Sequence, residues 1–386
     1  MKIGINTLPF KYPASGSSGY LFHLLQALAE VDQEDEYVLL RPHTLPQENG
    51  MLSTFSYQVT TVPGFVARSE NIEKLFWEQF IAPAAARKAG VDLFHVPYFA
   101  PPLFPRTPVV ITIHDVIPQR LPIYRADTKT KAYMELVARA AHKATLIITV
   151  SQHAKQDMID ALKLPAERIR VIYEAAGDEY RPITNPAVLA EVRARYGLNE
   201  RYILYLGGLD QRKNVPQLVR AFAHLYQQMH DPALQLLIAG NPDQLSGPLF
   251  PDPRPVAADL GLTGQIIYRY IQEEDKPAIY SGASVFVFPS LYEGFGLTPL
   301  EAMSCGAPVI SSNRTSLPEV VGDAAISLDP DDIHKLVEAM CSVLTNSELQ
   351  ADLRARSLQR AAQFNWRRTA AETIAVYKEA FVRSKR

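Results

Sequence analysis

The chain has 386 residues, which is too long for one ordinary hydrophobic core and predicts two α/β domains. Its 47% hydrophobic and 21% charged residues are typical of a soluble globular protein and exclude the disordered and collagen-like classes. A formal net charge of -2 gives no global attraction to nucleic acid or to an anionic membrane, so recognition must depend on local sites.

Cysteine usage and the amino terminus favour a reducing compartment. Cys305 and Cys341 lie in apolar helical patterns without CxxC spacing, which argues against a disulfide framework or a zinc site. The opening MKIGINTLPF lacks the succession of charged, apolar and small residues of a signal peptide. No apolar run reaches the roughly 18 residues that span a bilayer. We therefore expect a cytoplasmic protein.

Short apolar runs alternate with helical patterns in the first half of the chain, which predicts a doubly wound parallel sheet. The predicted strands span residues 2–6, 37–40, 93–96, 109–113, 146–150 and 169–172. The predicted helices span residues 19–30, 72–88, 128–143 and 151–162. Ser151 suits an N-cap, and Gly90 suits a helix stop.

A glycine-bearing loop precedes the first predicted helix. Residues 16–19 read GSSG, and a stripe of leucines follows them. Such a loop presents backbone N–H groups to an anion. Gly16, Ser18 and Gly19 are therefore candidates for binding a phosphate, and a flexible connector is the equal alternative.

Two polar residues end the predicted strand 109–113 in the segment VVITIHD. Ligands of such folds bind at the carboxyl ends of the strands, so we expect His114 to face a crevice there. A structural role is the alternative for a lone histidine. Asp115 is expected either to orient His114 or an acceptor hydroxyl, or equally to cap a turn.

The segment 120–170 carries ten Lys or Arg residues against five Asp or Glu residues. If these cations gather on one face, they favour a peripheral contact with anionic lipid beside a lipid-linked acceptor. Solvated helix faces explain the same count.

Prolines interrupt the pattern in segment 178–195, where we expect a hinge. Strands are then predicted at residues 202–206, 234–239, 265–268, 285–288, 308–311 and 325–328. Residues 241–255, with five prolines, predict a surface loop, and a last amphipathic helix follows Phe364. The predicted domains are residues 1–180, completed by helix 366–386, and residues 181–365.

A cationic turn follows the first strand of the second half, in LYLGGLDQRKN. Arg212 and Lys213 lie at the carboxyl end of this strand, and Pro216 suits the first turn of the next helix. Two cations there can hold a pyrophosphate and neutralise its charge as it leaves. A solvated basic turn is the alternative.

The segment VFVFPSLYEGFGLTPLEAM places one carboxylate on a loop and another in the helix predicted at 297–304. Glu293 and Glu301 can accept hydrogen bonds from hydroxyl groups while loop amides meet a phosphate, which fits a sugar joined to a diphosphate. Either glutamate alone could be a helix-end charge.

These segments together resemble the retaining glycosyltransferases of family 4, which have the GT-B fold. The resemblance covers nearly the whole chain, including LYLGGLDQRKN, the Glu-x7-Glu pair in EGFGLTPLE, and FNWRRTAAETIAVYKEA near the end. It implies two Rossmann-like domains with doubly wound parallel sheets, an interdomain cleft and a C-terminal crossover helix. It also implies a donor bound mainly to the second domain and an acceptor bound mainly to the first.

The resemblance assigns roles to individual residues. Arg212 and Lys213 would contact the donor phosphates, Glu301 the ribose, and Glu293 the transferred sugar. The implied catalytic residues are His114, Glu293, Arg212 and Lys213. The other implied donor contacts, including main-chain contacts to the base near 269–271, are Gly16, Ser18, Gly19, Gly208, Tyr270, Ile271, Phe295, Gly296, Leu297, Thr298 and Glu301.

The form IHDVIPQRLPIY resembles the mannosyltransferase-like branch of the family. This favours GDP-mannose as donor, with a UDP-sugar as the alternative, and a saccharide or lipid-linked saccharide as acceptor. We expect no cofactor and no nucleic-acid partner. The DxD pattern at Asp329 and Asp331 lies at a predicted helix start, where we interpret it as capping and not as a metal site.

Two other functions stay open. A nucleotide-sugar epimerase of related fold would need acid and base groups at the sugar and no acceptor. A non-catalytic nucleotide-sugar-binding protein would not need Arg212, Lys213, Glu293 and Glu301 together. The acceptor loops are expected at residues 8–18 and 61–71.

Overall fold

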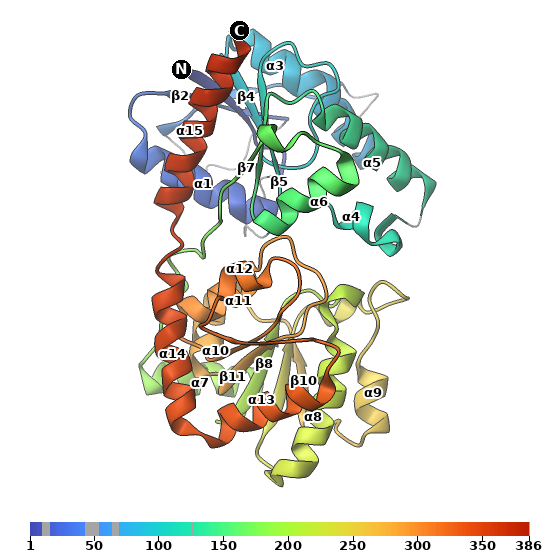
Figure 1. Ribbon diagram of the computed structural model, residues 1–386, viewed down its shortest axis with the longest axis vertical. Coiled ribbons are helices and arrows are strands. Elements are labelled where there is room, and N and C mark those ends of the chain that lie inside the picture. The colour runs from blue at the N-terminus through green and yellow to red at the C-terminus, as the bar shows by residue number, and fades with distance from the viewer. Residues whose placement is uncertain (10–15, 43–53, 64–68, 126, 386) are drawn as a thin grey trace. The chain divides into compact units, whose positions relative to one another are not determined.

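The computed structural model describes residues 1–9, 16–42, 54–63, 69–125 and 127–385 (Figure 1). Parts of both expected acceptor loops, residues 10–15 and 64–68, lie outside the described residues. The chain divides into two units, Met1–Glu174 with Asn365–Arg386, and Ala175–Phe364. The division falls at 174/175 and 364/365, where the sequence had suggested 180/181 and 365/366.

The first unit is built on a parallel sheet. Within the described residues its strand order is β3-β2-β1-β4-β5-β6-β7. All neighbouring strands pair in parallel. The strands are β1 (Lys2–Asn6), β2 (Glu36–Arg41), β3 (Ser56–Val59), β4 (Leu93–Val96), β5 (Val109–Ile113), β6 (Leu146–Thr149) and β7 (Ile169–Val171).

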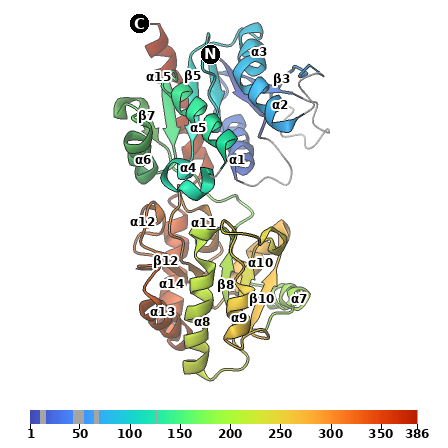
Figure 2. The same ribbon diagram turned by 90° about the vertical axis from the view of Figure 1, so that its right-hand side faces the viewer.

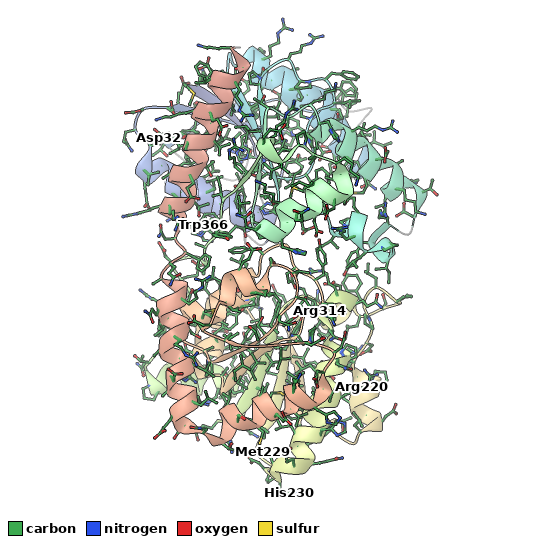
Figure 3. All side chains as sticks on the ribbon, in the orientation of Figure 1. Asp32, Arg220, Met229, His230, Arg314 and Trp366 are labelled. Atoms are coloured by element: carbon green, nitrogen blue, oxygen red, sulfur yellow. The ribbon has the colours of Figure 1, made fainter. Side chains whose placement is uncertain are left out.

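Helices cover both faces of this sheet (Figure 1). They are α1 (Ser17–Val31), α2 (Glu70–Phe76), the π-helix η2 (Trp77–Ile81), α3 (Ala82–Lys88), α4 (Ile117–Arg120), the 3-10 helix η3 (Pro122–Arg125), α5 (Thr128–Ala141), α6 (Gln152–Leu162), η4 (Ala166–Arg168) and α15 (Trp366–Ser384). Buried residues of α3, α5 and α6 share a core with β2, β4, β5 and β6. Helix α15 packs on α1, where Trp366 stacks on His23 with ring centroids 5.3 Å apart (Figure 3).

The second unit repeats the architecture with strand order β10-β9-β8-β11-β12-β13, again in parallel. Its strands are β8 (Tyr202–Leu206), β9 (Gln235–Ala239), β10 (Ile266–Arg269), β11 (Val285–Phe288), β12 (Val309–Ser312) and β13 (Ile326–Leu328). Every residue of β8, β9 and β11 is buried, as expected for parallel strands covered on both faces.

The helices of the second unit form two layers (Figure 2). They are α7 (Pro186–Tyr196), η5 (Gln211–Lys213), α8 (Val215–Met229), η6 (Pro242–Gln244), α9 (Arg254–Asp259), η7 (Glu273–Asp275), α10 (Lys276–Gly282), α11 (Leu297–Ser304), α12 (Leu317–Val321), α13 (Ile333–Thr345) and α14 (Ser347–Ala361). Helix α8 packs on α9 and α13, whereas α10 packs on α7 and α11, and α11 packs on α14. Right-handed crossovers place these two groups on opposite faces of the sheet.

Several predicted elements are confirmed and others are wrong. Strands β1, β4, β5, β8 and β11 and helix α11 have the predicted bounds, and Ser151 caps α6 by accepting a hydrogen bond from the Ala154 amide. Strand β3 was missed, and residues 241–255 contain η6 and the start of α9. The expected break in the pattern at 178–195 is wrong from Pro186 onward, because α7 begins there with Asn185 as its N-cap, and the hinge itself stays a prediction.

In each unit the direction of strand order reverses beside the first strand. The reversal lies between β1 and β4 in the first unit, and between β8 and β11 in the second. The carboxyl ends of the strands at such a reversal are where ligands bind in folds of this kind. No helix in the described part of the chain combines the length and the apolar character that a membrane crossing requires.

Candidate active site

The connections after β8 and β11 meet at the switch point of the second unit. Strand β8 leads through Gly207 and Gly208 to the short helix η5, which carries Arg212 and Lys213. Strand β11 leads to the loop that carries Glu293. The backbone links the two connections, because the Leu291 amide donates to the Arg212 carbonyl over 2.7 Å. The fold thus brings together the cationic turn and the loop glutamate that the sequence singled out.

Glu293 is the centre of a buried charge cluster. Its Oε1 accepts hydrogen bonds from Nζ of Lys213 at 2.5 Å and from Oγ of Ser290 at 2.6 Å. Its Oε2 accepts from Nη1 of Arg212 at 2.6 Å. Lys213 is 7% exposed and Glu293 8% exposed. We call Arg212, Lys213, Glu293 and Ser290 the charge cluster.

The electrostatic balance of the charge cluster keeps the carboxylate ionised. Burial raises the pKa of Glu293, but the charges of Lys213 and Arg212 and the hydrogen bonds from Lys213 and Ser290 outweigh it, so its pKa lies below the ordinary value. Lys213 also lies over the ring of Phe288, with Nζ 4.8 Å from the centroid. Arg212 is held on two further sides, by Asp210 at 3.0 Å and by the Tyr292 carbonyl at 2.9 Å.

The loop after Glu293 is fixed before it enters α11. Thr315 Oγ1 accepts from the Glu293 amide at 3.0 Å, and Ser316 Oγ donates to the carbonyls of Glu293 and Phe295. Gly296 caps α11 with φ of 129°, and a Cβ there would lie 2.9 Å from Leu317 Cδ2. Both the backbone conformation and the packing therefore require glycine at position 296.

Helix α11 begins directly after this loop. Leu297 and Thr298 occupy its first turn, where helix amides have no intrahelical acceptor, and the first turn contains no acidic residue. Phe295 is buried and packs edge-on against Phe364, with centroids 6.1 Å apart. The backbone N–H groups of the loop and of this first turn can therefore donate hydrogen bonds to an anion.

Glu301 lies one turn further along α11 in a separate polar environment. Its Oε2 accepts a hydrogen bond from Tyr280 Oη at 2.9 Å. Burial raises the pKa of Glu301 to about 7, although Lys276 and the bond from Tyr280 act in the opposite direction. The carboxyl therefore changes charge near neutral pH.

Tyr270 and Ile271, which the sequence placed near a base, follow β10. The side chain of Ile271 is 3% exposed and that of Tyr270 is 52% exposed. Gly208 is exposed, and its carbonyl accepts from Tyr205 Oη at 2.5 Å.

His114 of the first unit is anchored by a carboxylate that the sequence did not reveal. Its Nδ1 lies 2.8 Å from Oε1 of Glu174, which is 7% exposed. Tyr20 packs edge-on against the imidazole at 4.7 Å. Burial lowers the pKa of His114, but the hydrogen bond to Glu174 and its charge outweigh burial, so the pKa is raised overall.

Asp115 makes a local contact with the backbone. Its Oδ1 accepts from the Ile117 amide at 3.0 Å, which is the turn-capping geometry. Glu174, not Asp115, supplies the carboxylate that binds Nδ1 of His114. Gly16, Ser18 and Gly19 lie at the start of α1, where Gly16 has φ of 55° and Ser18 is buried.

Comparison with known proteins decides the family. Residues 14–176 match the family described as Glycosyltransferase Family 4, and residues 191–360 match Glycosyl transferases group 1. The chain is 31% identical over 392 residues to an Escherichia coli protein named O-antigen chain mannosyltransferase B, covering 98% of this chain and 100% of that one. The chain belongs to glycosyltransferase family 4.

Solved structures show that this glycosyltransferase has the GT-B fold. Sucrose-phosphate synthase from Thermosynechococcus elongatus matches with a TM-score of 0.74 at 23% identity, covering 99% of each chain. The Anabaena protein HepE, in complex with UDP, matches with a TM-score of 0.71 at 17% identity, covering 98% of this chain and 100% of that one. The predicted fold class, with two Rossmann-like parallel-sheet domains and a last helix that returns to the first, is confirmed.

The DxD pattern of the glycosyltransferase is engaged in protein contacts. Asp329 and Asp331 each accept from Nη2 of Arg314, at 2.8 and 2.7 Å (Figure 3). The adjacent Asp332 caps α13 through the Lys335 amide. Across the residues described here, no group of three or more His, Cys, Asp or Glu side chains is arranged to hold a metal ion.

Sequence reasoning missed three supporting residues of the two sites. Asp210 lies two positions before Arg212 and Ser290 three before Glu293, so each was visible inside a motif already singled out. Glu174 lies 60 positions from His114, and no local pattern joins the two.

Proposed function

We propose that this glycosyltransferase moves a hexose from a nucleotide diphosphate sugar to a saccharide or lipid-linked saccharide, in polysaccharide or glycoconjugate synthesis. GDP-mannose is the favoured donor and a UDP-sugar the alternative. The observation that carries the proposal is the charge cluster at the β8/β11 switch point, where two cations and one carboxylate are buried together. The name of the Escherichia coli relative supports mannose, and the UDP bound in HepE supports a nucleotide.

The second unit is proposed to bind the donor. Arg212 and Lys213 hold the diphosphate, together with the main chain at Gly208 and at Gly296 to Thr298. Glu293 accepts hydrogen bonds from hydroxyls of the transferred sugar, and Glu301 accepts from the ribose. The base lies along the main chain at Tyr270 and Ile271, since the Ile271 side chain is buried.

The first unit is proposed to bind the acceptor and to assist at the sugar. His114, oriented by Glu174, contacts a hydroxyl of the transferred hexose. The start of α1, at Gly16, Ser18 and Gly19, offers amides to a phosphate oxygen. Asp115 caps the turn after β5 and is a weaker candidate for contact with the acceptor.

In the proposed reaction the bond between the anomeric carbon and the diphosphate oxygen breaks, and its electron pair leaves with the diphosphate. The acceptor oxygen forms the new bond on the same face, which retains the anomeric configuration. The acceptor proton passes to the leaving phosphate oxygen. Arg212, Lys213 and the amides of α11 stabilise the growing negative charge, so the proposal requires no metal ion.

Thermal-shift titration with GDP-, UDP- and ADP-sugars tests the donor, because a ligand that binds the native state raises its melting temperature. We expect GDP-mannose to give the largest shift and Lys213→Met to reduce it. The matched control is Lys335→Met, which removes an exposed lysine of the same unit. A shift that is equal for all three nucleotides, or unaffected by Lys213→Met, would count against the assignment.

Product analysis separates transfer from its rivals. Incubation with donor alone should return unchanged nucleotide sugar, whereas an epimerised sugar would favour the epimerase. With donor and a saccharide acceptor, we expect product with the anomeric configuration of the donor, by NMR, at a rate unaffected by EDTA. A trapped glycosyl-enzyme adduct would contradict the same-face mechanism.

A peripheral contact with anionic lipid is part of the proposal, because a lipid-linked acceptor is anchored in a membrane. The local excess of cations in residues 120–170 supports it. We expect the protein to sediment with phosphatidylglycerol vesicles at low salt and to be released at high salt. An absence of salt-sensitive binding would remove this part of the proposal.

A further inference from the structure

A cavity of about 450 Å³ lies in the first unit, largely within the cationic segment 120–170 and away from the residues assigned to the donor and to the sugar. Its walls come from α4, η3, α5 and the end of α6. The charged and titratable side chains that line it are Arg120, Arg125, Lys131, Glu135, Arg139 and His142. Four arginine or lysine residues therefore face one glutamate.

One face of α5 supplies much of this lining. Lys131, Glu135, Ala138 and His142 follow one another at spacings of three or four residues, and all line the cavity. Side chains at these spacings lie on the same side of a helix. This face of α5 contributes Lys131 to the cavity, and α4 and η3 contribute Arg120 and Arg125.

Two of the four cations are neutralised within the fold. Arg120 donates through Nε to Asp157 Oδ1 at 2.6 Å, and Arg139 donates through Nε to Glu135 Oε1 at 2.9 Å. Arg125 and Lys131 have no carboxylate within salt-bridge distance among the described residues, and Arg125 makes a long bond of 3.4 Å to the Gln119 carbonyl. Two positive charges thus remain available to a ligand.

We propose that this cavity binds the phosphate group of a phosphate ester, through Arg125 and Lys131. A guanidinium and an ammonium are suited to a phosphate, and they exclude a metal cation. Met134, Ala138 and Leu162 line the same cavity and suit the organic part of the ester. The cavity shares no lining residue with the charge cluster or with His114, so the inference goes beyond the proposed transfer reaction and does not depend on it.

Residue-specific acylation of the full-length protein tests the site, because Lys131 and the nearby Lys129 are both exposed on α5 and only Lys131 lines the cavity. The acetylation rate of each lysine is followed by mass spectrometry with two probes, glycerol 3-phosphate in solution and vesicles containing phosphatidylglycerol. We expect Lys131 to be slowed severalfold relative to Lys129 by at least one probe. Protection by the soluble ester alone identifies a soluble ligand, and protection by vesicles alone identifies a lipid headgroup.

A charge-matched pair of variants completes the test. R125Q/K131Q removes the two available charges, and R87Q/K88Q removes an exposed arginine and an exposed lysine of α3, outside both the cavity and the segment 120–170. The first variant should bind the protecting probe roughly tenfold more weakly, as expected for losing charge-assisted hydrogen bonds, and the second should bind it like the wild type. Equal rates for Lys131 and Lys129 with both probes, or equal losses in the two variants, would overturn the proposal.

Discussion

Nζ of Lys213 lies 2.5 Å from Oε1 of Glu293, and both residues are less than a tenth exposed. Arg212 binds the other oxygen of the same carboxylate at 2.6 Å. A diphosphate that entered the switch point would approach the same two cations. The charge cluster therefore couples the stability of the second unit to the occupancy of its proposed donor site, and this coupling can be measured.

Glu293 and Lys213 should contribute unequally to the free energy of unfolding. Glu293→Gln leaves Lys213 and Arg212 without their shared carboxylate, and we expect the free energy of unfolding to fall by about 3 kcal/mol. Lys213→Met should cost less, because Glu293 keeps Arg212 as a partner. In K213M/E293Q the two costs should not add, since the residues are in direct contact.

Urea unfolding followed by circular dichroism measures these changes. The control is Lys335→Met, which breaks an ion pair at 3.3 Å between side chains 68% and 32% exposed. It should change the free energy by no more than about 0.5 kcal/mol. A loss for Glu293→Gln no greater than that of the control would show that the buried pair is not a source of stability.

Product binding and turnover should respond to Glu293 in opposite directions. Glu293→Gln frees two cations, so we expect GDP to bind more tightly, by roughly tenfold for a gain of about 1.4 kcal/mol. Transfer should nevertheless fall on the order of a hundredfold, because the sugar loses a hydroxyl acceptor in the transition state. Calorimetric titration with GDP and initial rates with GDP-mannose measure the two effects.

Lys213→Met should both weaken the binding of GDP and slow the transfer reaction. Arg254→Gln serves as the control in the same unit, because Arg254 is exposed and pairs locally with Asp252 at 2.7 Å. If Glu293→Gln weakened GDP binding as much as Lys213→Met does, the Glu293 carboxylate and the diphosphate would not compete for the same cations.

The sequence predicted the local structure of the proposed donor site well, because each of its segments is continuous in the chain. Glu293, Glu301 and the helix between them lie in one strand–loop–helix segment, and the bounds of α11 were predicted from that segment. Arg212 and Lys213 follow a fully buried strand, which places them at the carboxyl edge of the sheet. Parallel pairing of β8 with β11 then brings the two segments together.

The missed features depend on context that short-range patterns do not contain. Pro186 suggested an irregular hinge, but a proline in the first turn is compatible with a helix, and Asn185 caps it. Strand β3 is short and largely exposed, so it lacks the apolar run of the other strands. His114 follows β5 and Glu174 lies shortly after β7, so only the folded sheet brings these two residues together.

Nucleotide affinity should rise with pH through the titration of Glu301, whose pKa is raised to about 7 chiefly by burial. The ionised carboxylate accepts hydrogen bonds from ribose hydroxyls better than the protonated form. Glu301→Gln should give weaker binding that no longer changes with pH in this range. Calorimetric titrations on either side of pH 7 use GDP-mannose, because its terminal phosphate is esterified and does not titrate in this range. Glu274→Gln, at an exposed position in the same unit, is the control.

A rise in pH should lower the contribution of Glu301 to the free energy of unfolding, although it raises nucleotide affinity. The folded state binds this proton more tightly than the unfolded chain, so the contribution of Glu301 to the unfolding free energy falls as pH rises from the ordinary value of 4.5 to about 7. Glu301→Gln should remove that slope, and Glu274→Gln should leave it. A wild-type pH dependence of GDP-mannose binding in Glu301→Gln would contradict the proposed contact between Glu301 and the ribose.

The pair formed by His114 and Glu174 predicts a histidine that stays protonated to a higher pH than an ordinary one. Burial lowers the pKa of His114, and Glu174 more than offsets it, so Glu174→Gln should move the imidazole titration to lower pH. NMR titration of the ring resonances measures this shift. The stability that the pair contributes is present below the unfolded pKa and is lost as pH rises through the folded pKa, so Glu174→Gln should also flatten that loss.

Turnover should follow the same contact. Glu174 holds the ring of His114 in one orientation through its hydrogen bond to Nδ1. In metal sites, carboxylates that hydrogen-bond a histidine in this way affect activity by about 10- to 100-fold. We expect Glu174→Gln to lower kcat by roughly tenfold with a smaller effect on the KM for the donor, because the ring is proposed to contact the sugar and not the nucleotide. Glu167→Gln removes an exposed carboxylate from the same unit and should leave both the titration and kcat unchanged. An unshifted His114 titration in Glu174→Gln, or an equal fall of kcat in Glu167→Gln, would separate the contact from the reaction.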